Sequence, residues 1–297
     1  MTESRTSAAG RVVVGVDGSE SSLGAAVYAA GVARRREVGL LVVHATPWRG
    51  VDDALPMTDP DIRAEYDESA TTLVRSAADT VRETTGLDDV TAEVIQDHPV
   101  DALVALSATA SVLVIGRRGL GGVPGLLLGS TAGAVVQRSD CPVIALPDEP
   151  AADDLDRRPV VVGVEGREGD GEVLAFAVTE ARARGTELVA VHAWREVGME
   201  AALGGFGPYV DWTTVEAKAQ QLLSEAVARW GTEAADVVIR ETVARDRATP
   251  ALLTASETAG VLVVGHRHRG RLARLGSTMH GVLHRASCPV AVVPLQQ

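Results

Sequence analysis

The segment VLVIG at residues 112–116, followed by the loop 117–128 and then Gly129-Ser130-Thr131, decides the fold of this chain. A short apolar run rich in β-branched residues is typical of a buried strand. The residues that follow read G-x2-G-x9-G-S-T, in which glycines let backbone N–H groups approach an anion. Ser130 and Thr131 would then stand at a helix N-terminus, where N–H groups and the dipole favour a phosphate. The alternative is an ordinary flexible loop with a serine N-cap.

The same strand recurs in the second half of the chain, so we searched for a duplication. VVVGVDG at 12–18 aligns with VVVGVEG at 160–166, an offset of 148 residues. The same or nearly the same offset relates LVVHA at 41–45 to VAVHA at 189–193, VLVIG at 112–116 to VLVVG at 261–265, GST at 129–131 to GST at 276–278, and CPV at 141–143 to CPV at 288–290. Five blocks in one order indicate an internal repeat.

We therefore predict two domains, one over 1–150 with a tail at 1–10, and one over 151–297. The acidic, proline-containing stretch 147–159 is typical of a linker. Length agrees, since 297 residues suit about two domains of roughly 150 residues.

Apolar runs alternate with helix-like stretches in each repeat. The first repeat has predicted strands at 12–16, 39–45, 90–95, 111–116 and 142–146, and helices at 20–36, 62–85, 99–109 and 130–139. In the second repeat we predict strands at 160–164, 187–193, 236–243, 261–265 and 289–293. This rhythm predicts an α/β fold, two tandem doubly wound parallel five-stranded sheets. Ligands of such sheets bind beyond the carboxyl ends of the strands, where the strand order reverses.

Composition excludes several functional classes. The net charge of −12 and the absence of a basic face argue against nucleic acid as a partner. The single lysine, Lys218, and the absence of a G-x4-G-K-[ST] string exclude a Walker-type P-loop. No apolar run approaches the roughly 20 residues of a membrane span. With no signal sequence and only Cys141 and Cys288 we expect a cytoplasmic protein without disulfides or a zinc site.

Other polar residues at strand ends allow competing interpretations. Asp17 closes the first strand and could accept hydrogen bonds from a ligand, or cap the helix that begins near Glu20. His44 and His192 each end a strand, and we interpret them as packing or supporting residues. His266-x-His268, with His280 and His284 four residues apart, permits a metal site, but no carboxylate or cysteine completes one, and we predict none.

The Asp-ended first strand, the V-H-A second strand, the G-x2-G-x9-G-[ST] loop and the terminal C-P-V strand resemble the universal stress protein family. The similarity covers both repeats and is greatest to tandem members of its ATP-binding branch, which share the adenine nucleotide α-hydrolase-like fold. The resemblance implies ATP, with or without Mg²⁺, as the ligand.

The resemblance also implies a site in the first repeat. Gly15, Val16, Asp17 and Ala45 would line the adenine and ribose, Ile115, Gly116 and Gly119 would border the ribose and phosphates, and Gly129, Ser130 and Thr131 would bind the phosphates. Arg117 and Arg118 occupy variable motif positions and are included for their charge.

The second repeat departs from this pattern. Glu165 replaces the aspartate, His268 stands at the second glycine, and the x9 spacing shrinks to x7. We predict a second, weaker site formed by Gly163, Val164, Glu165, Ala193, Val264, Gly265, His268, Gly276, Ser277 and Thr278.

The function predicted from these features is that of an ATP-binding stress-response protein, a sensor or regulator with no catalytic residues. Slow ATP hydrolysis or nucleotidyl transfer is one alternative, and a partner-binding module with a structural nucleotide is another. The apolar terminal strands at 142–146 and 289–293 would lie at sheet edges, which proteins cover. We therefore expect the two repeats to pair as an intramolecular pseudo-dimer, with a homodimer of whole chains as a further option and the regulatory partner unknown.

Overall fold

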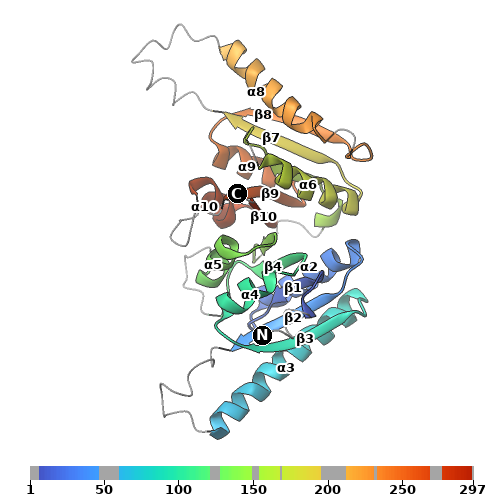
Figure 1. The fold of residues 1–297 in the computed structure, drawn as a ribbon, viewed down its shortest axis with the longest axis vertical. Helices are drawn as coiled ribbons and strands as arrows, with labels where there is room; N and C mark the ends of the chain where they lie inside the picture. Colours follow the sequence, from blue (N-terminus) through green and yellow to red (C-terminus); the bar gives the residue numbers. More distant parts are fainter. Residues whose placement is uncertain are drawn as a thin grey trace. The chain divides into compact units, whose positions relative to one another are not determined.

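The computed structural model describes residues 7–46, 60–120, 128–148, 154–167, 169–194, 212–230, 233–267 and 276–295, the side chains of 60–63 excepted. The chain divides into two compact units, unit 1 over Met1–Asp148 and unit 2 over Glu149–Gln297. Each is an α/β domain, as predicted, and strands and helices alternate along both (Figure 1).

Unit 1 is built around a parallel sheet. Its described strands are β1 (Val12–Gly15), β2 (Leu40–Thr46), β3 (Val90–Gln96), β4 (Val112–Gly116) and β5 (Val143–Leu146), in the order β3-β2-β1-β4-β5. All neighbouring pairs are parallel, and Val12 pairs with Leu40 on one side and with Val112 on the other. The strand order reverses between β1 and β4, so a ligand site is expected above their carboxyl ends.

Helices cover the sheet of unit 1 on both faces. Its described helices are α2 (Glu20–Arg35), α3 (Pro60–Thr85), α4 (Pro99–Ser107) and α5 (Ser130–Arg138). α2 packs with α3, and α4 packs with α5. Right-handed crossovers that run from β1 towards β3 and then back towards β5 put these two pairs on opposite faces. The strands are accordingly apolar on both sides, and Val12, Val13 and Val14 have no exposed surface.

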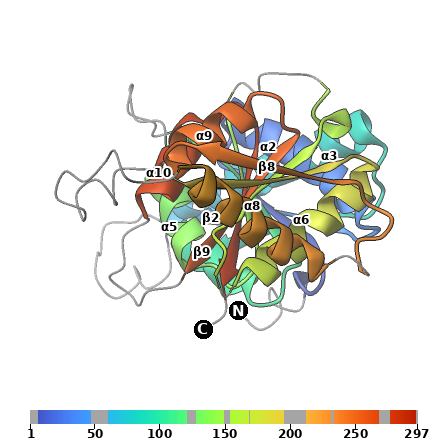
Figure 2. The same cartoon turned by 90° about the horizontal axis from the view of Figure 1, so that it is seen from above.

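Unit 2 repeats this topology. After the short 3-10 helix η1 (Leu155–Arg157), its described strands are β6 (Val160–Gly163), β7 (Leu188–Trp194), β8 (Ile239–Arg245), β9 (Val261–Arg267) and β10 (Val290–Leu295). Their parallel order, β8-β7-β6-β9-β10, matches that of unit 1. The helices are α6 (Asp170–Arg184), α8 (Trp212–Ala228), α9 (Ala248–Ser256) and α10 (Ser277–Arg285). Within this unit α9 and α10 lie next to each other, as both views show (Figures 1 and 2).

The predicted strands and helices are all present, and their bounds shift by three residues at most. The largest shift is in β8, which begins at Ile239 and not at Asp236. Residues 233–236, which read Glu-Ala-Ala-Asp, form turns instead of the start of the strand.

Candidate functional site

A cavity of about 520 Å³ lies over the carboxyl ends of β1 and β4 in unit 1. This is a volume that suits a small-molecule ligand. All the residues predicted for the first site line it, namely Gly15, Val16, Asp17, Ala45, Ile115, Gly116, Arg117, Arg118, Gly119, Gly129, Ser130 and Thr131. Sequence reasoning missed Ser22, Val43, His44, Pro99, Leu103, Leu128 and Ala132, which complete the lining. Most of these are ordinary core or helix residues that carry no motif signal.

Asp17 joins the end of β1 to the loop after β4. One carboxylate oxygen, Oδ1, accepts the backbone N–H and the hydroxyl of Ser19 at 3.0 and 2.6 Å. The other, Oδ2, accepts the backbone N–H of Leu120 at 2.9 Å. Partial burial opposes ionisation of this carboxyl, but the hydrogen bonds from Ser19 and Leu120 outweigh it and lower the pKa of Asp17.

The alternative in which Asp17 caps the following helix is wrong. Ser19 is the N-cap of α2, and its side chain accepts the N–H of Ser22 at 3.2 Å. The helix is therefore capped without Asp17, whose carboxylate is left to hold the Leu120 segment beside the cavity.

The glycines of the loop allow close backbone contacts. A Cβ added to Gly119 would collide with the Asp17 carboxylate, and one added to Gly116 would lie 2.6 Å from the Ser21 hydroxyl. The Gly129 N–H donates to the Arg117 carbonyl at 2.7 Å, which closes the loop across residues 121–127, outside the described part of the chain. These glycines therefore shape the cavity wall by their lack of a side chain.

The N-terminus of α5 points its first turn at this cavity. Gly129 is the N-cap, with φ −69° and ψ 155°, and has no side chain to bond the first-turn N–H groups. The serine N-cap considered above is therefore wrong, because Ser130 is the first helical residue. Uncapped N–H groups and the helix dipole make such a terminus favourable for an anion.

Two arginines flank the same end of the cavity. Arg117 lines it while only 4% exposed, and Arg118 forms an ion pair with Asp148, just after β5. Arg117 therefore brings one buried cationic residue to the cavity lining, whereas the charge of Arg118 is balanced by Asp148.

His44 and its repeat counterpart His192 have the supporting role expected of them. The Nδ1 of His44 lies 2.8 Å from the Val16 carbonyl, and that of His192 lies 2.8 Å from the Val164 carbonyl. A carbonyl only accepts, so Nδ1 carries the proton in each ring. Each histidine thereby ties its strand to the loop that enters the cavity.

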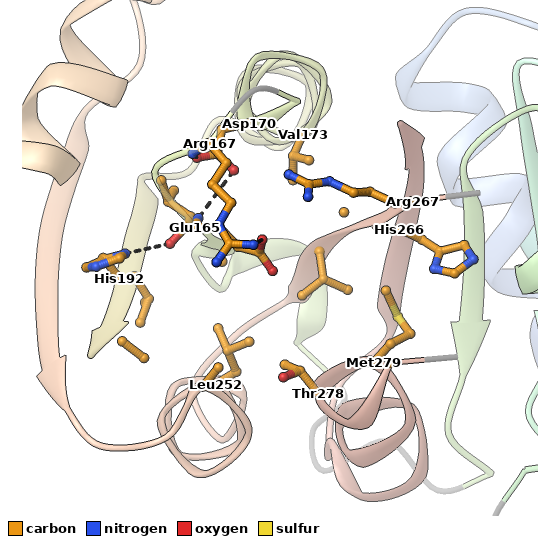
Figure 3. A pocket seen from close by; sticks show the side chains of 18 of the residues that line it. Glu165, Arg167, Asp170, Val173, His192, Leu252, His266, Arg267, Thr278 and Met279 are labelled. Carbon is orange, nitrogen blue, oxygen red and sulfur yellow. Dashed lines mark hydrogen bonds and ion pairs between the residues drawn. The ribbon is translucent and has the colours of Figure 1, made fainter. Parts of the chain in front are cut away.

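Unit 2 has its own cavity, of about 560 Å³, at the equivalent strand ends (Figure 3). It is lined by nine of the residues predicted for the second site, Gly163, Val164, Glu165, Ala193, Val264, Gly265, Gly276, Ser277 and Thr278. The tenth, His268, lies outside the described residues. Arg167, Asp170, His192, His266, Arg267, Met279 and Leu295 also line this cavity and were missed.

The acidic residue that follows the first strand behaves differently in unit 2. The Glu165 side chain is 67% exposed and lies 3.8 Å from the Arg167 guanidinium. Asp170 instead accepts the backbone N–H groups of Glu165, Gly166 and Arg167, at 3.2, 2.6 and 2.9 Å. Glu165 therefore belongs to the cavity lining and pairs with Arg167, while Asp170 takes the backbone N–H groups (Figure 3).

One position that is ionic in unit 1 is apolar beside the second cavity. Leu295 stands two residues after Val293, as Asp148 stands two residues after Leu146, so an ionic position of unit 1 has become apolar. A Cβ added to Gly265 would meet Val173 at 2.8 Å and Leu295 at 3.3 Å. Arg267 reaches into the cavity from β9, opposite Arg167 (Figure 3). The two cavities are therefore related in position and different in chemistry.

The family of this chain follows from comparison with known proteins. The model of the universal stress protein family matches residues 9–147 and again residues 156–294. The chain belongs to the universal stress protein family. Among reviewed relatives, universal stress protein Rv2005c of Mycobacterium tuberculosis is 35% identical over 290 residues, which cover 95% of this chain and 96% of that protein. Universal stress protein Rv2623 of the same organism is 32% identical over 288 residues, 95% of each chain.

Solved structures agree on the fold of this universal stress protein. The crystal structure of a universal stress protein from Archaeoglobus fulgidus has a TM-score of 0.70 at 20% identity, and the match covers 97% of each chain. Both the tandem arrangement and the parallel α/β architecture are therefore those of the family.

Unit 2 also contains an aromatic cluster, which the sequence motifs did not predict. Trp194, at the end of β7, stacks on Trp212 with ring centroids 6.2 Å apart. The Arg245 guanidinium carbon lies 5.8 and 5.4 Å from the two ring centroids. Trp194 and Arg245 are register partners of β7 and β8, so the sheet itself brings them together.

Among the described residues, no three His, Cys, Asp or Glu side chains gather closely enough to hold a metal ion. None of the described helices is long and apolar enough to cross a membrane.

Proposed function

We propose that unit 1 of this universal stress protein binds an adenine nucleotide, ATP, with or without Mg²⁺, and that the protein acts as a nucleotide-dependent sensor or regulator. The observation that carries the proposal is the convergence in one cavity of Asp17, the strand-end glycines and the N-terminus of α5. These are the groups that the family's nucleotide motif would supply.

The residues present fit such a ligand. The apolar end of the cavity, with Val16, Ala45 and Leu103, suits a base, and the end with Arg117, Ser130 and Thr131 suits phosphates. Gly116 and Gly119 keep the wall free of side chains between these ends, since a Cβ at either position would meet a neighbouring side chain. Bound nucleotide would have its base held by groups near β1, β2 and α4, and its phosphates held by groups after β4 and at the start of α5.

Binding without rapid catalysis is the function we favour. The pKa of Asp17 is lowered, which makes this carboxylate a weak base. Single-turnover measurements with labelled ATP test this point directly: bound ATP is expected to be recovered intact, and accumulation of ADP would favour the hydrolase alternative.

We further propose that unit 2 binds the same nucleotide more weakly. Asp170 fills the cluster of N–H groups at the end of β6, and Leu295 stands in the place of Asp148. Calorimetric titration of the whole chain with ATP should therefore resolve one tight site that is lost on substitution of unit 1 residues. Equal affinities, or a tight site lost only on substitution of Ser277 or Thr278, would overturn the assignment. Mass spectrometry of ligand released from the purified protein identifies the nucleotide.

A further inference from the structure

An open groove adjoins the second cavity on the side of α9 and α10. It shares Ala193, Ala248, Ser277 and Thr278 with that cavity, so the two are continuous. Beyond the shared residues, the groove is lined by Asp246, Arg247, Thr249, Pro250, His280, Gly281 and Arg285. We call it the α9–α10 groove. It lies wholly within unit 2, and the family motif assigns none of these seven residues to nucleotide.

Two helix N-termini meet at this groove. α9 begins at Ala248 and α10 begins at Ser277, and both of these residues line it. The N-caps, Arg247 and Gly276, make no side-chain capping hydrogen bond. α9 and α10 pack against each other (Figure 2). The partial positive charges of both termini therefore act on the same space.

Cationic side chains add to the potential of the two termini. Arg247 and Arg285 are exposed along the groove, and no ion pair to either guanidinium occurs within the described residues. The acidic residue of the lining, Asp246, accepts the backbone N–H of Arg247 at 2.6 Å. A protein with a net charge of −12 thus presents a local cationic surface. Such a surface favours a multiply charged anion.

The equivalent helices of unit 1, α4 and α5, carry less positive charge. Helices α4 and α5 have the same lengths as α9 and α10, so Asp101 corresponds to Pro250, and Arg138 corresponds to Arg285. In unit 1 these two form an ion pair at 2.7 Å. His98 corresponds to Arg247 as the N-cap. Unit 2 has therefore lost a carboxylate that neutralises its arginine and gained a second guanidinium.

We infer that the α9–α10 groove is an anion site of unit 2 that binds phosphate groups of an oligophosphate chain, beyond any phosphate held at Gly276–Thr278. Arg247 and Arg285 would each contact a phosphate of the chain, and the N-terminus of α9 would donate N–H groups. The chain could belong to an inorganic oligophosphate or to a nucleotide, since both present the same phosphoanhydride oxygens. The inference does not depend on the nucleotide proposed for unit 1.

The test is calorimetric titration of the full-length chain with inorganic tripolyphosphate at fixed ionic strength. We expect Arg247→Ala and Arg285→Ala each to weaken binding by about three- to tenfold, the loss of one charge-assisted contact. Arg138→Ala, the matched control in unit 1, should leave the affinity unchanged. Equal effects of Arg138→Ala and Arg285→Ala, or no effect of either groove variant, would overturn the inference.

A second variant tests the effect of the groove's charge without removing an arginine. Pro250→Asp restores to α9 the carboxylate that Asp101 supplies in α4, and aspartate is well tolerated in the first turn of a helix. It is expected to weaken tripolyphosphate binding as Arg285→Ala does, while both arginines are kept. Unchanged binding in the folded variant would contradict the inference.

The source of the phosphate chain is decided by comparing tripolyphosphate, AMP and ATP on the same variants. If Pro250→Asp weakens the binding of ATP but leaves the binding of tripolyphosphate unchanged, the groove serves a nucleotide in unit 2. If tripolyphosphate binds and unit 1 takes no ATP, the nucleotide proposal fails and the groove stands. If neither ligand responds to Pro250→Asp or Arg247→Ala, the groove inference fails on its own.

Discussion

The carboxylate of Asp17 accepts the backbone N–H of Leu120 across 103 residues of sequence, at a distance of 2.9 Å. This bond links the end of β1 to the loop that leaves β4, the two strands between which the strand order reverses. Leu120 is itself 72% exposed, so packing of its side chain does little to hold the loop. Asp17 is therefore one of the contacts that hold the loop beside the cavity, together with the bond from the Gly129 N–H to the Arg117 carbonyl.

Replacing Asp17 by alanine is expected to weaken ATP binding by at least about tenfold, or about 1.4 kcal/mol. The substitution removes both a ligand acceptor and the bond that holds the loop. Unfolding of unit 1 should be affected by only about 1 kcal/mol, because water can solvate the exposed Leu120 N–H. Calorimetry and urea denaturation measure the two effects. Glu165→Ala, at the exposed counterpart, serves as the control, and equal affinity losses in the two variants would contradict the assignment.

Gly119→Ala tests the same contact from the other side. Its Cβ would collide with the Asp17 carboxylate, so we expect the Asp17–Leu120 bond to break and ATP affinity to fall. Gly24→Ala is the matched control, because a Cβ there meets nothing within 4 Å and alanine favours a helix by about 1 kcal/mol. A Gly119→Ala variant that binds ATP as the wild type does would remove this contact from the site.

Sequence predicted the strand ends well because each motif residue sits where a short apolar run stops. Asp17 and Gly116 are such residues, and a parallel sheet necessarily brings the ends of β1 and β4 to one edge. The glycine spacing predicted the loop and the start of α5 for the same reason. These inferences needed only local periodicity and the order of the strands.

Other features of the sites depend on contacts that no local pattern encodes. Asp170 was not singled out, although its carboxylate occupies the N–H groups after β6, because only the three-dimensional turn brings Gly166 to it. Asp101 and Arg138, which form an ion pair between two helices, are 37 residues apart along the chain. The loss of this ion pair in unit 2 becomes visible only when the two units are compared helix by helix.

The lowered pKa of Asp17 predicts a pH dependence. The folded-state pKa is below the ordinary value of 3.8, so this group stabilises unit 1 at pH values above that value. The contribution is lost as the pH falls through the folded-state pKa. The stability difference between wild type and Asp17→Asn, measured by urea denaturation, should therefore shrink as the pH is lowered from about 5 to about 3. A difference that stays constant over this range would contradict the prediction.

Burial of Cys141 predicts a thiol with low reactivity. Desolvation raises its pKa to about 12, and the residue is 6% exposed. At pH 8 the thiolate fraction would be roughly one in ten thousand, and thiolate is the reactive form. In a Cys288→Ala variant, we expect reaction with an aromatic disulfide reagent to be slow when native and fast in urea. Prompt reaction of the native protein would show that Cys141 is accessible.

A buried ion pair in unit 2 gives the last prediction. The Glu180 and Arg184 side chains lie one turn apart on α6, 1% and 0% exposed, with Oε2 and Nε 3.5 Å apart. Arg184 also donates to the carbonyl of Leu155 at 3.1 Å, which fastens η1 to this helix. By the 148-residue offset, Glu180 corresponds to Val32 of α2, which is fully buried.

Breaking this pair should destabilise unit 2 strongly, because the remaining charge stays buried. We expect Arg184→Met to lower the free energy of unfolding by about 3 kcal/mol or more. The double variant Glu180→Met/Arg184→Met should recover much of that loss, since apolar side chains of similar volume replace a buried pair at little cost. Urea denaturation of the three proteins measures both effects. A double variant as unstable as Arg184→Met alone would mean that the contacts of Arg184 with Leu155 and Asp156, and not the buried charge, dominate.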